Sequence, residues 1–298
     1  MRDRTHVPVL LEEVLEFLDC GRAGTYIDCT LGLAGHALAI LGGNPRAKLV
    51  GLDRDELALE VARERLTPFA GRVKLYHADY RGLLEIGLSF ADVKGVLLDL
   101  GMSSFQLDAP ERGFSYSLDG PLDMRMDRRG RFTAARVIAD YSEPRLAELF
   151  LTYGELHQAR RLAREIVRRR KLKAIERTTE LRTIIEEVFR WHPQPGKLHP
   201  AAKVFQALRI EVNNELEGLP EFLHELIRQV RPGTRIVAIS FHSLEDRIVK
   251  HTFVEFASAR TAPPRLRILT AKPTIAGEEE VARNSRSRSA KLRAAEKV

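Results

Sequence analysis

Apolar and polar residues follow two repeating patterns along this chain. Short apolar runs predict β-strands at Tyr26–Cys29, Leu49–Asp53, Val73–His77, Val93–Asp99 and Arg235–Ser240, with a weaker candidate at Leu266–Leu269. Segments with apolar residues at helical spacing predict helices before and between these runs, at Val9–Leu18, Asp55–Leu66 and Pro200–Val230. Strands that alternate with helices are typical of an α/β fold, in which helices cover both faces of a parallel sheet.

The connection between the fourth and fifth predicted strands is too long for an ordinary crossover. It runs for well over a hundred residues, whereas a crossover needs a few tens at most. An inserted domain must fill this part of the chain. Stretches containing Pro and Gly at Arg112–Pro121 and His192–Pro200 are the expected hinges, and Glu143–Arg190 has the pattern of several amphipathic helices. The expected domains are a core of residues 1–110 and 204–298 and an inserted helical domain of residues 111–203.

The composition is that of a soluble enzyme. The chain has 298 residues, of which 44% are hydrophobic and 30% charged, enough to bury a substantial core. No apolar run approaches the roughly 20 residues of a membrane helix, and the N-terminus lacks a signal-peptide stretch, so we expect a cytoplasmic protein. Cys20 and Cys29 are the only cysteines and form no C-x-x-C motif. They indicate neither a disulfide framework nor a metal site, and Cys29 is most simply a small buried residue.

The net charge of +7 is concentrated in the middle of the chain. From Glu111 to Lys203 there are 20 Lys and Arg against 13 Asp and Glu, so the remaining residues sum to zero. A predicted amphipathic helix in this part carries Arg160, Arg161, Arg164, Arg168 and Arg169 on its polar face. Such a face is either an ordinary solvated surface or a phosphate-binding one. A second basic run, Arg283–Arg293, contains no acid and is equally open to being a mobile tail.

A turn containing glycines lies between the first two predicted strands. The first strand ends at Asp28, the turn contains Gly32 and Gly35, and the second strand ends in Asp53. This is the arrangement of a nucleotide-binding half-fold, in which an acid accepts hydrogen bonds from ribose hydroxyls. The turn lacks the G-x-G-x-x-G spacing that binds a dinucleotide pyrophosphate. We therefore expect an adenosine ligand without a pyrophosphate, of which S-adenosylmethionine is the commonest.

The carboxyl ends of parallel strands meet at one crevice, where open sheets bind their ligands. These ends carry Asp28, the turn at 32–36, Asp53, Asp79 with Tyr80, and Asp99 with Ser103 and Gln106. Asp53 is the strongest candidate, the alternative being an acid that caps the helix starting near Asp55. Tyr80 is open to flanking an adenine ring or to being a half-buried aromatic residue. Asp99 follows a buried run, where an acid without a functional partner would be costly.

Longer blocks of the sequence are similar to the signature blocks of the MraW family of ribosomal RNA small subunit methyltransferases: HVPVLLEEVLEFL, YIDCTLGLAGHA, LLDLGMSSFQLDAPERGFSYSLDGPLDMRMD, HPAAKVFQALRIEVNNEL and ISFHSLEDRIVK. They span nearly the whole chain, and their order is far more specific than the glycine turn. The resemblance implies a class I S-adenosylmethionine-dependent methyltransferase, with a Rossmann-like, mostly parallel seven-stranded sheet and an inserted helical domain. It also implies methylation of the exocyclic N4 of a cytidine in the decoding region of 16S rRNA.

The resemblance also implies which residues contact the cofactor. Those that match the family's positions are Ala34, Gly35, His36, Asp53, Tyr80, Asp99 and Gln106. The family commonly has glycine where this chain has Cys29 and Ala34, arginine at Leu33, phenylalanine at Tyr80 and proline at Phe105. The added methyl group of Ala34 is tolerated in most backbone conformations except those at positive φ.

Methyl transfer to N4 needs acceptors that localise the nitrogen lone pair, because that lone pair is delocalised into the ring. Asp99, or backbone carbonyls of the loop that follows it, would accept the amine hydrogens and take the proton after transfer. Ser103 is a candidate for a hydrogen bond to the base, with loop capping as an equal alternative. His242, after the fifth strand, is more simply structural than a residue that orients substrate. The catalytic candidates are therefore Asp99 and Ser103.

Two other classes of function stay open at this point. A nicotinamide oxidoreductase would use the same half-fold and Asp53, although the turn spacing argues against it. A non-catalytic RNA-binding assembly factor would keep the basic middle segment but would need no acid at Asp99. DNA is the weaker methylation substrate, since DLGMSS stands where DNA amino-methyltransferases have an Asx-Pro-Pro-aromatic turn. The expected partner is 16S rRNA within the small ribosomal subunit, and homodimer formation is left open.

Overall fold

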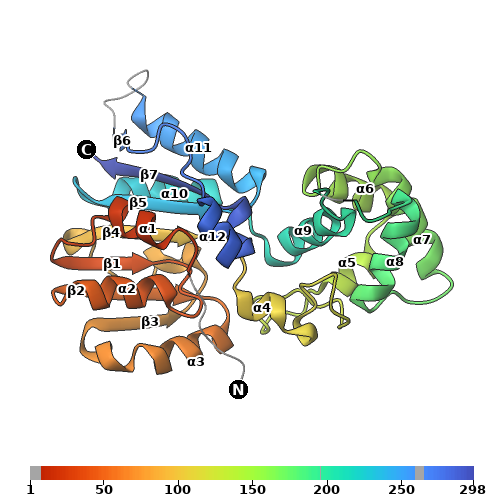
Figure 1. The fold of residues 1–298 in the computed structure, drawn as a ribbon, viewed down its shortest axis with the longest axis horizontal. Coiled ribbons are helices and arrows are strands. Elements are labelled where there is room, and N and C mark those ends of the chain that lie inside the picture. The colour runs from red at the N-terminus through yellow and green to blue at the C-terminus, as the bar shows by residue number, and fades with distance from the viewer. Residues whose placement is uncertain (1–7, 195, 259–264) are drawn as a thin grey trace. The chain divides into compact units, whose positions relative to one another are not determined.

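The computed structural model describes residues 8–194, 196–258 and 265–298, and the chain forms two compact units (Figure 1). One unit joins the residues up to Gly101 to those from Leu216 onward, and the other runs from Met102 to Glu215. We call them the sheet unit and the inserted unit. In the described parts of the chain, every helix is too short or too polar to cross a lipid bilayer.

The sheet unit is built on a seven-stranded sheet with the strand order β3-β2-β1-β4-β5-β7-β6. The strands β3, β2, β1, β4 and β5 are parallel, and β7 pairs antiparallel with both β5 and β6. This confirms the predicted mixed α/β fold class, and each strand predicted from the sequence is present. The bounds are Gly24–Asp28 (β1), Ala47–Asp53 (β2), Val73–His77 (β3), Val93–Asp99 (β4), Arg235–Ser240 (β5), Leu266–Ile268 (β6) and Lys291–Lys297 (β7).

The strand β7 corrects the interpretation of the basic run Arg283–Arg293 as a mobile tail. Leu292 and Ala294 of β7 are fully buried, and the strand lies between β5 and β6. Arg293 is also mostly buried and donates from Nε to Asp246 over 2.6 Å, so this arginine is neutralised within the protein. The segment forms a strand because its backbone pairs with β5 on one side and β6 on the other, although its residues have low strand propensity.

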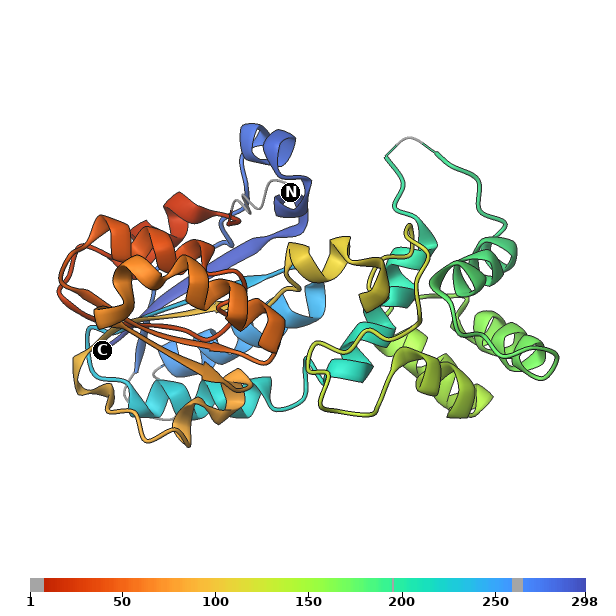
Figure 2. The same ribbon diagram turned by 90° about the horizontal axis from the view of Figure 1, so that it is seen from below.

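Helices cover both faces of the sheet, as predicted (Figure 2). Leu97 enters one core with α1, α2 and α3, whereas its neighbour Leu98 enters the other with α10 and α11. Each fully buried leucine contributes about 1.5–3 kcal/mol through removal of its apolar surface from water. The helices are Leu11–Leu18 (α1), Gly35–Gly43 (α2), Glu56–Arg65 (α3), Leu219–Gln229 (α10), Ser243–Ala257 (α11) and Glu278–Arg283 (α12), with short 3-10 turns at Thr67–Arg72, Tyr80–Leu84, Phe90–Asp92 and Ser285–Ser289.

The inserted unit is helical and has its own core. Its helices are Ser104–Asp108 (α4), Ala134–Asp140 (α5), Glu143–Thr152 (α6), Ala159–Arg170 (α7), Thr178–Phe189 (α8) and Pro200–Asn213 (α9), with a 3-10 turn at Pro110–Arg112. Apolar residues at helical spacing meet in one cluster that includes Phe150 of α6, Leu162 of α7, Leu181 of α8 and Leu208 of α9. The amphipathic pattern of 143–190 therefore forms α6, α7 and α8.

The bounds of the two units differ from the predicted ones. Because α9 buries Val204 and Leu208 in the core of the inserted unit, that unit extends to Glu215 rather than to Lys203. Phe114 belongs to the same core, and the unit begins at Met102. The expected hinges at 112–121 and 192–200 are wrong, since both stretches lie inside the inserted unit and the second joins α8 to α9.

Candidate active site

The turn that follows β1 is bonded to the ends of both neighbouring strands. Gly32 donates its backbone N–H to Oδ2 of Asp53, at the end of β2, over 2.7 Å. Asp99, at the end of β4, donates its backbone N–H to the Thr30 hydroxyl over 2.6 Å. Since β1 lies between β2 and β4, its carboxyl end is the switch point at which open parallel sheets bind ligands. Asp53 and Asp99 thus lie on either side of one short turn.

Asp53 does not cap the helix that follows it. Asp55 is the N-cap of α3 and accepts the N–H of Leu57 over 3.2 Å, so the capping alternative for Asp53 is wrong. Asp53 instead accepts the N–H of Gly32 on Oδ2 and that of Asp55 on Oδ1, the latter over 2.8 Å. Burial raises the pKa of Asp53, and these two hydrogen bonds oppose the shift. A carboxylate has about four lone-pair sites, so each oxygen keeps one for a ribose hydroxyl.

Ala34 adopts the left-handed conformation that favours glycine. It is the N-cap of α2, with φ 62° and ψ 30°, and its side chain is fully buried. A non-glycine residue in this region costs about 1–2 kcal/mol through the approach of Cβ to the backbone. Glycine would adopt this conformation without that cost. At Gly35 a Cβ would lie 3.2 Å from the Pro8 ring, a tight contact that would require Pro8 to shift by a few tenths of an ångström.

His36 is buried at the start of α2 and faces the Asp99 carboxyl group. Its Nε2 lies 3.0 Å from the Val9 carbonyl oxygen, which can only accept, so Nε2 carries the proton. Nδ1 lies 3.9 Å from Oδ2 of Asp99, too far for a direct hydrogen bond. The structure therefore brings two of the predicted cofactor residues together, and the contact with Val9 holds the histidine ring in place.

One carboxylate oxygen of Asp99 lacks a hydrogen-bond partner among the described residues. This oxygen, Oδ1, is buried. Burial, followed by the negative charges of Asp28 and Glu245, raises the pKa of Asp99 to about 8. Asp28 is itself buried, and burial raises its pKa to about 7 although it accepts the Thr30 N–H. A polar atom of this kind points to a ligand that supplies the missing hydrogen bond or charge.

His242 stabilises the start of a helix, which agrees with the structural role that the sequence favoured for it. It is the N-cap of α11 and its Nδ1 accepts the N–H of Glu245 over 3.4 Å. Glu245 is almost fully buried and accepts the N–H of Phe241 over 2.9 Å. Sequence reasoning missed Glu245, whose charge acts on Asp99. Its place in the block SFHSLED, directly after β5, was the available signal.

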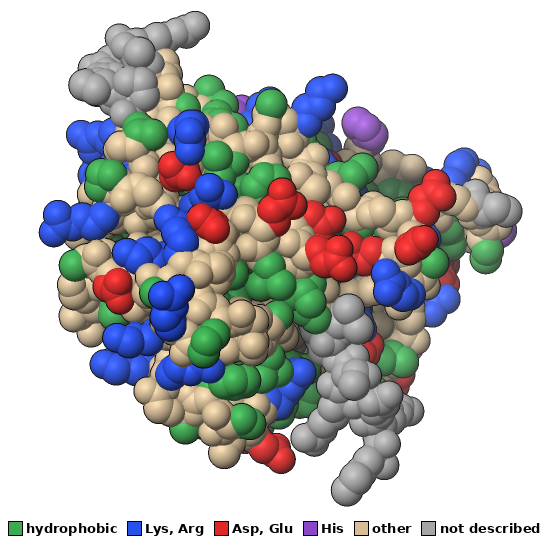
Figure 3. Space-filling view, turned by 60° about the vertical axis from the view of Figure 1, so that its left-hand side comes forward, with side chains coloured by type: hydrophobic (Ala, Val, Ile, Leu, Met, Phe, Trp, Pro, Cys, Tyr) green, Lys and Arg blue, Asp and Glu red, His purple; other side chains and the backbone are tan. Residues whose placement is uncertain are grey.

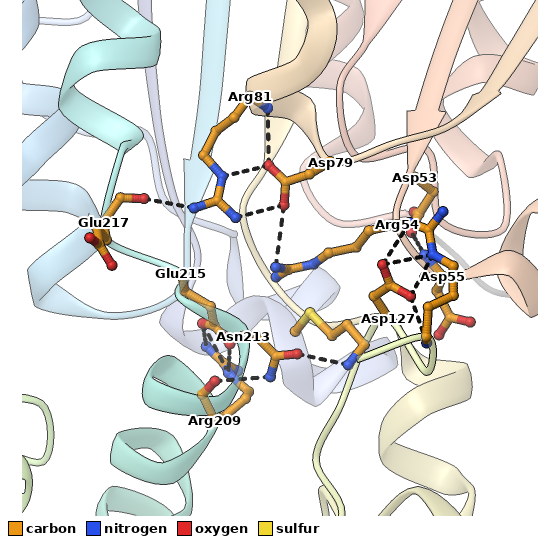
Figure 4. A network of polar contacts seen from close by, with 12 residues as sticks. Asp53, Arg54, Asp55, Asp79, Arg81, Asp127, Arg209, Asn213, Glu215 and Glu217 are labelled. Carbon is orange, nitrogen blue, oxygen red and sulfur yellow. Dashed lines mark hydrogen bonds and ion pairs between the residues drawn. The ribbon is translucent and has the colours of Figure 1, made fainter. Parts of the chain in front are cut away.

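Asp79 and Tyr80 stand at the end of β3. Arg81 binds both carboxylate oxygens of Asp79, over 2.7 and 3.0 Å, and Arg54 lies 3.4 Å away on the other side (Figure 4). Burial alone would raise the pKa of Asp79, but the hydrogen bonds from Arg81 bring it below the usual value. Tyr80 is buried and packs edge-on against Phe222, with ring centroids 5.0 Å apart. Its ring is therefore part of the core beneath this edge of the sheet.

Ser103 and Gln106 belong to the inserted unit and cap the start of α4. The Ser103 hydroxyl accepts the Gln106 N–H over 3.3 Å, and Oε1 of Gln106 accepts the Ser103 N–H over 3.1 Å. This reciprocal pair is a capping box, the alternative that the sequence left open for Ser103. The other predicted residues, Ala34, Gly35, His36, Asp53, Tyr80 and Asp99, belong to the sheet unit.

The arginines of α7 fall into groups with different surroundings. Arg168 and Arg169 each donate to Glu165 over 2.7 Å, so part of their charge is balanced on the helix itself. Arg170 donates to the carbonyl oxygens of Ile138 and Tyr141, over 2.6 and 2.7 Å, and so anchors the end of α5. Arg160, Arg161, Arg164 and Arg168 are all exposed, and the exposed Arg164 also lies 3.6 Å from Glu143.

The positive charge belongs mainly to the inserted unit. Residues 102–215 contain 21 Lys and Arg against 16 Asp and Glu, a net charge of +5, and the rest of the chain has 27 against 25, a net charge of +2. On the face drawn in Figure 3, most basic side chains lie on the left with a few acidic ones among them, and a group of acidic side chains lies right of the centre. The inserted unit is therefore the better candidate for contacts with a polyanion.

Comparison with known proteins gives a match along the full chain. The family model described as the MraW methylase family matches residues 3–298. A ribosomal RNA small subunit methyltransferase H from Desulfotalea psychrophila is 48% identical over 301 residues, which cover 99% of this chain and 99% of that protein. A protein of the same name from Geobacter sulfurreducens is 48% identical over 310 residues, again with 99% of each chain covered.

Solved structures share less with this chain. An rRNA methylase from Streptococcus thermophilus is 11% identical, with 99% of each chain covered and a TM-score of 0.42. A likeness at this level carries no argument about the site. The fold class follows instead from the strand order of the sheet itself.

Proposed function

The chain belongs to the MraW methylase family, and we propose that it transfers a methyl group from S-adenosylmethionine to the exocyclic N4 of a cytidine in the decoding region of 16S rRNA. Membership of a methylase family removes the nicotinamide oxidoreductase alternative. The observation that carries the proposal is the position of Asp99 at the switch point of the sheet, where its buried Oδ1 accepts no hydrogen bond from the part of the chain that the structure describes.

The residues at the switch point fit an adenosine cofactor. Asp53 has spare acceptor sites for the ribose hydroxyls, while its bonds to Gly32 and Asp55 hold it in place. The partly buried Asp99 and the buried Asp28 lie close enough for each other's charge to matter, which suits a ligand with a positive charge such as a sulfonium or an α-amino group. Contacts of Ala34, Gly35, His36, Tyr80 and Gln106 with the cofactor follow from the family resemblance.

Asp99 has the properties needed for the chemistry of the amine. When bound, S-adenosylmethionine supplies an electrophilic methyl carbon. The cytosine N4 forms a bond to that carbon as the carbon–sulfur bond breaks, and N4 then releases a proton. An acceptor at Asp99 would localise the N4 lone pair before transfer and take this proton afterwards. Its raised pKa makes the ionised carboxylate a stronger base than an ordinary aspartate. Ser103 stays a candidate for a hydrogen bond to the base.

The target base must leave the RNA stack before N4 can be approached in line. The inserted unit, with its net charge of +5, is proposed to hold the surrounding RNA through phosphate contacts. The exposed arginines of α7 are the first candidates for these contacts, whereas Arg170 supports the fold of the unit.

The decisive experiment is methyl transfer from labelled S-adenosylmethionine to 16S rRNA, free and within purified small subunits, followed by nucleoside mass spectrometry. We expect N4-methylcytidine as the product and its loss in Asp99→Ala, with cofactor binding measured separately. Label in another nucleoside, or no N4-methylcytidine above a control without enzyme, would refute the proposed substrate. Undiminished product with Asp99→Ala would refute the role of Asp99, and no product with any RNA would favour an assembly factor.

A further inference from the structure

A pocket in the inserted unit is lined by residues that have no part in the candidate active site. It has a volume of about 410 Å³ and is lined by residues of α8 and by described residues between α8 and α9. Its lining includes Arg182, Glu186, Trp191, Lys197 and His199. This volume is within the roughly 300–1,000 Å³ of small-ligand sites. Every lining residue belongs to the same compact unit, so the pocket does not depend on the sheet unit.

One wall of the pocket is an ordered set of rings. Trp191 packs edge-on against His199, with centroids 5.1 Å apart, and His199 stacks on Tyr116 at 5.1 Å and 16°. Tyr116 in turn meets Phe205 of the unit's core. His199 is also the N-cap of α9, its Nδ1 accepting the Ala201 N–H over 3.1 Å. The rings are therefore positioned by the core and by a helix end before any ligand binds.

The polar side of the pocket is a carboxylate held in its ionised form. Oε1 of Glu186 accepts from Nε of Arg182 over 2.6 Å and from Nε2 of His199 over 3.0 Å. The hydrogen bond from Arg182, then that from His199, lowers the pKa of Glu186. Among the described residues, the hydrogen bonds to this side chain all fall on Oε1, which leaves Oε2 able to accept from a ligand.

This combination matches one class of ligand. A single-stranded base stacks on an aromatic ring, and a lysine pairs with the adjoining phosphate. Among the four bases, guanine alone offers two neighbouring donors, N1–H and N2–H, which together can fill the two lone-pair sites of Oε2 that the described residues leave open. We propose that the pocket binds an unpaired guanosine of the RNA substrate, with the base on Trp191, its donor edge toward Glu186 and its phosphate near Lys197. The proposal rests on the proposed function in so far as the substrate is RNA.

Trp191 is the only tryptophan in the chain, which provides a direct measurement. The full-length protein is titrated with GMP, AMP, CMP and UMP, and then with short RNA strands that contain one guanosine or one inosine at the same place. We expect quenching of tryptophan fluorescence by GMP and by the guanosine strand. Inosine lacks the 2-amino group, so its strand should bind about tenfold more weakly because one charge-assisted hydrogen bond is missing.

Variants separate the pocket from the methylation site. Glu186→Gln removes the ionised acceptor and should abolish the preference for guanosine over inosine, while Lys171→Gln, an exposed residue of the same unit outside the pocket, should not. Affinity for S-adenosylmethionine shows that each variant is folded. Equal quenching by all four nucleotides, or none, overturns the proposal. A response to GMP with no difference between the two RNA strands also overturns it, in favour of a free-nucleotide site. Failure to form N4-methylcytidine would refute the proposed function and leave this result standing.

Discussion

Asp53 accepts the backbone N–H of Gly32 over 2.7 Å, although Asp53 ends β2 and Gly32 lies in the turn after β1. This hydrogen bond makes Asp53 part of the glycine turn as well as a candidate ligand of the cofactor ribose. Substitution of Asp53 therefore acts on the shape of the turn and on the affinity for the ligand at once.

Replacing Asp53 with Asn should lower both the stability of the protein and its affinity for S-adenosylmethionine. An amide has one acceptor oxygen, so one of the two backbone N–H groups now bonded to Asp53 is left without its partner, which costs about 1–3 kcal/mol. Chemical denaturation should show this destabilisation, and calorimetric titration should show weaker binding of S-adenosylmethionine. Asp55→Asn is the matched control, because Asn also caps helices well. Equal effects of both substitutions would contradict a special role for Asp53.

Replacing Ala34 with Gly should stabilise the protein. The left-handed backbone costs an alanine about 1–2 kcal/mol, and the greater freedom of glycine in the unfolded chain offsets about 0.5–1 kcal/mol of this. The net gain is then about 0.5 kcal/mol, measurable by urea denaturation, with unchanged cofactor affinity. Gly32→Ala, at φ 51°, is the opposite change and should destabilise. A less stable Ala34→Gly variant would show that the buried methyl group packs better than the strain suggests.

The affinity for S-adenosylmethionine should increase with pH. Burial raises the pKa of Asp99 to about 8 and of Asp28 to about 7, so both acids are largely protonated in the free protein at pH 6. A cationic ligand favours their ionised forms and must displace protons below these pKa values. The ratio of dissociation constants for S-adenosylhomocysteine, which lacks the sulfonium charge, and S-adenosylmethionine should therefore grow between pH 6 and 9. Asp99→Asn should reduce this dependence on pH. Dissociation constants that change equally with pH for both ligands would contradict the prediction.

The stability of the free protein should change in the opposite direction with pH. An acid whose pKa is higher in the folded than in the unfolded state stabilises the fold below its unfolded value, and this contribution disappears as pH rises through the folded value. For Asp28 and Asp99 the window runs from about pH 4, the unfolded value, up to the folded values of about 7 and about 8. Urea denaturation across this range should show a steeper decline for the natural protein than for Asp99→Asn. Parallel curves would indicate that Asp99 is already ionised in the free protein.

Arginines of α7 should divide into RNA-binding and structural residues. Charge reversal at Arg161 and Arg164 should weaken RNA binding at low salt and reduce the slope of affinity against salt by about 0.7–0.9 for each phosphate that is no longer neutralised. Cofactor affinity should stay the same, and stability should change by less than about 1 kcal/mol, because the ion pair between Arg164 and Glu143 is exposed. Arg170→Ala should instead destabilise the protein, because it leaves the carbonyl groups of Ile138 and Tyr141 without their donor. Weaker cofactor binding by the variant at Arg161 and Arg164 would contradict this division.

Much of the fold was predictable because it depends on local patterns. Strands and amphipathic helices appear as periods in the sequence, and the long segment between β4 and β5 required an inserted unit. The bounds of that unit were not predictable, since α9 follows a stretch with the composition of a hinge and yet packs into the inserted core. The strand β7 was missed because a run rich in Lys, Arg and Ala has no strand signal until its backbone is paired.

The sequence by itself determined the family, the class of fold and the acids at the strand ends, because motif order and strand polarity are properties of the chain. Only the tertiary structure decided which partner each acid has. Asp55 rather than Asp53 caps α3, Glu245 approaches closely enough to affect Asp99, and Asp99 keeps a buried oxygen without a hydrogen bond from any described residue. These outcomes depend on distances between atoms far apart in the chain, and packing sets such distances.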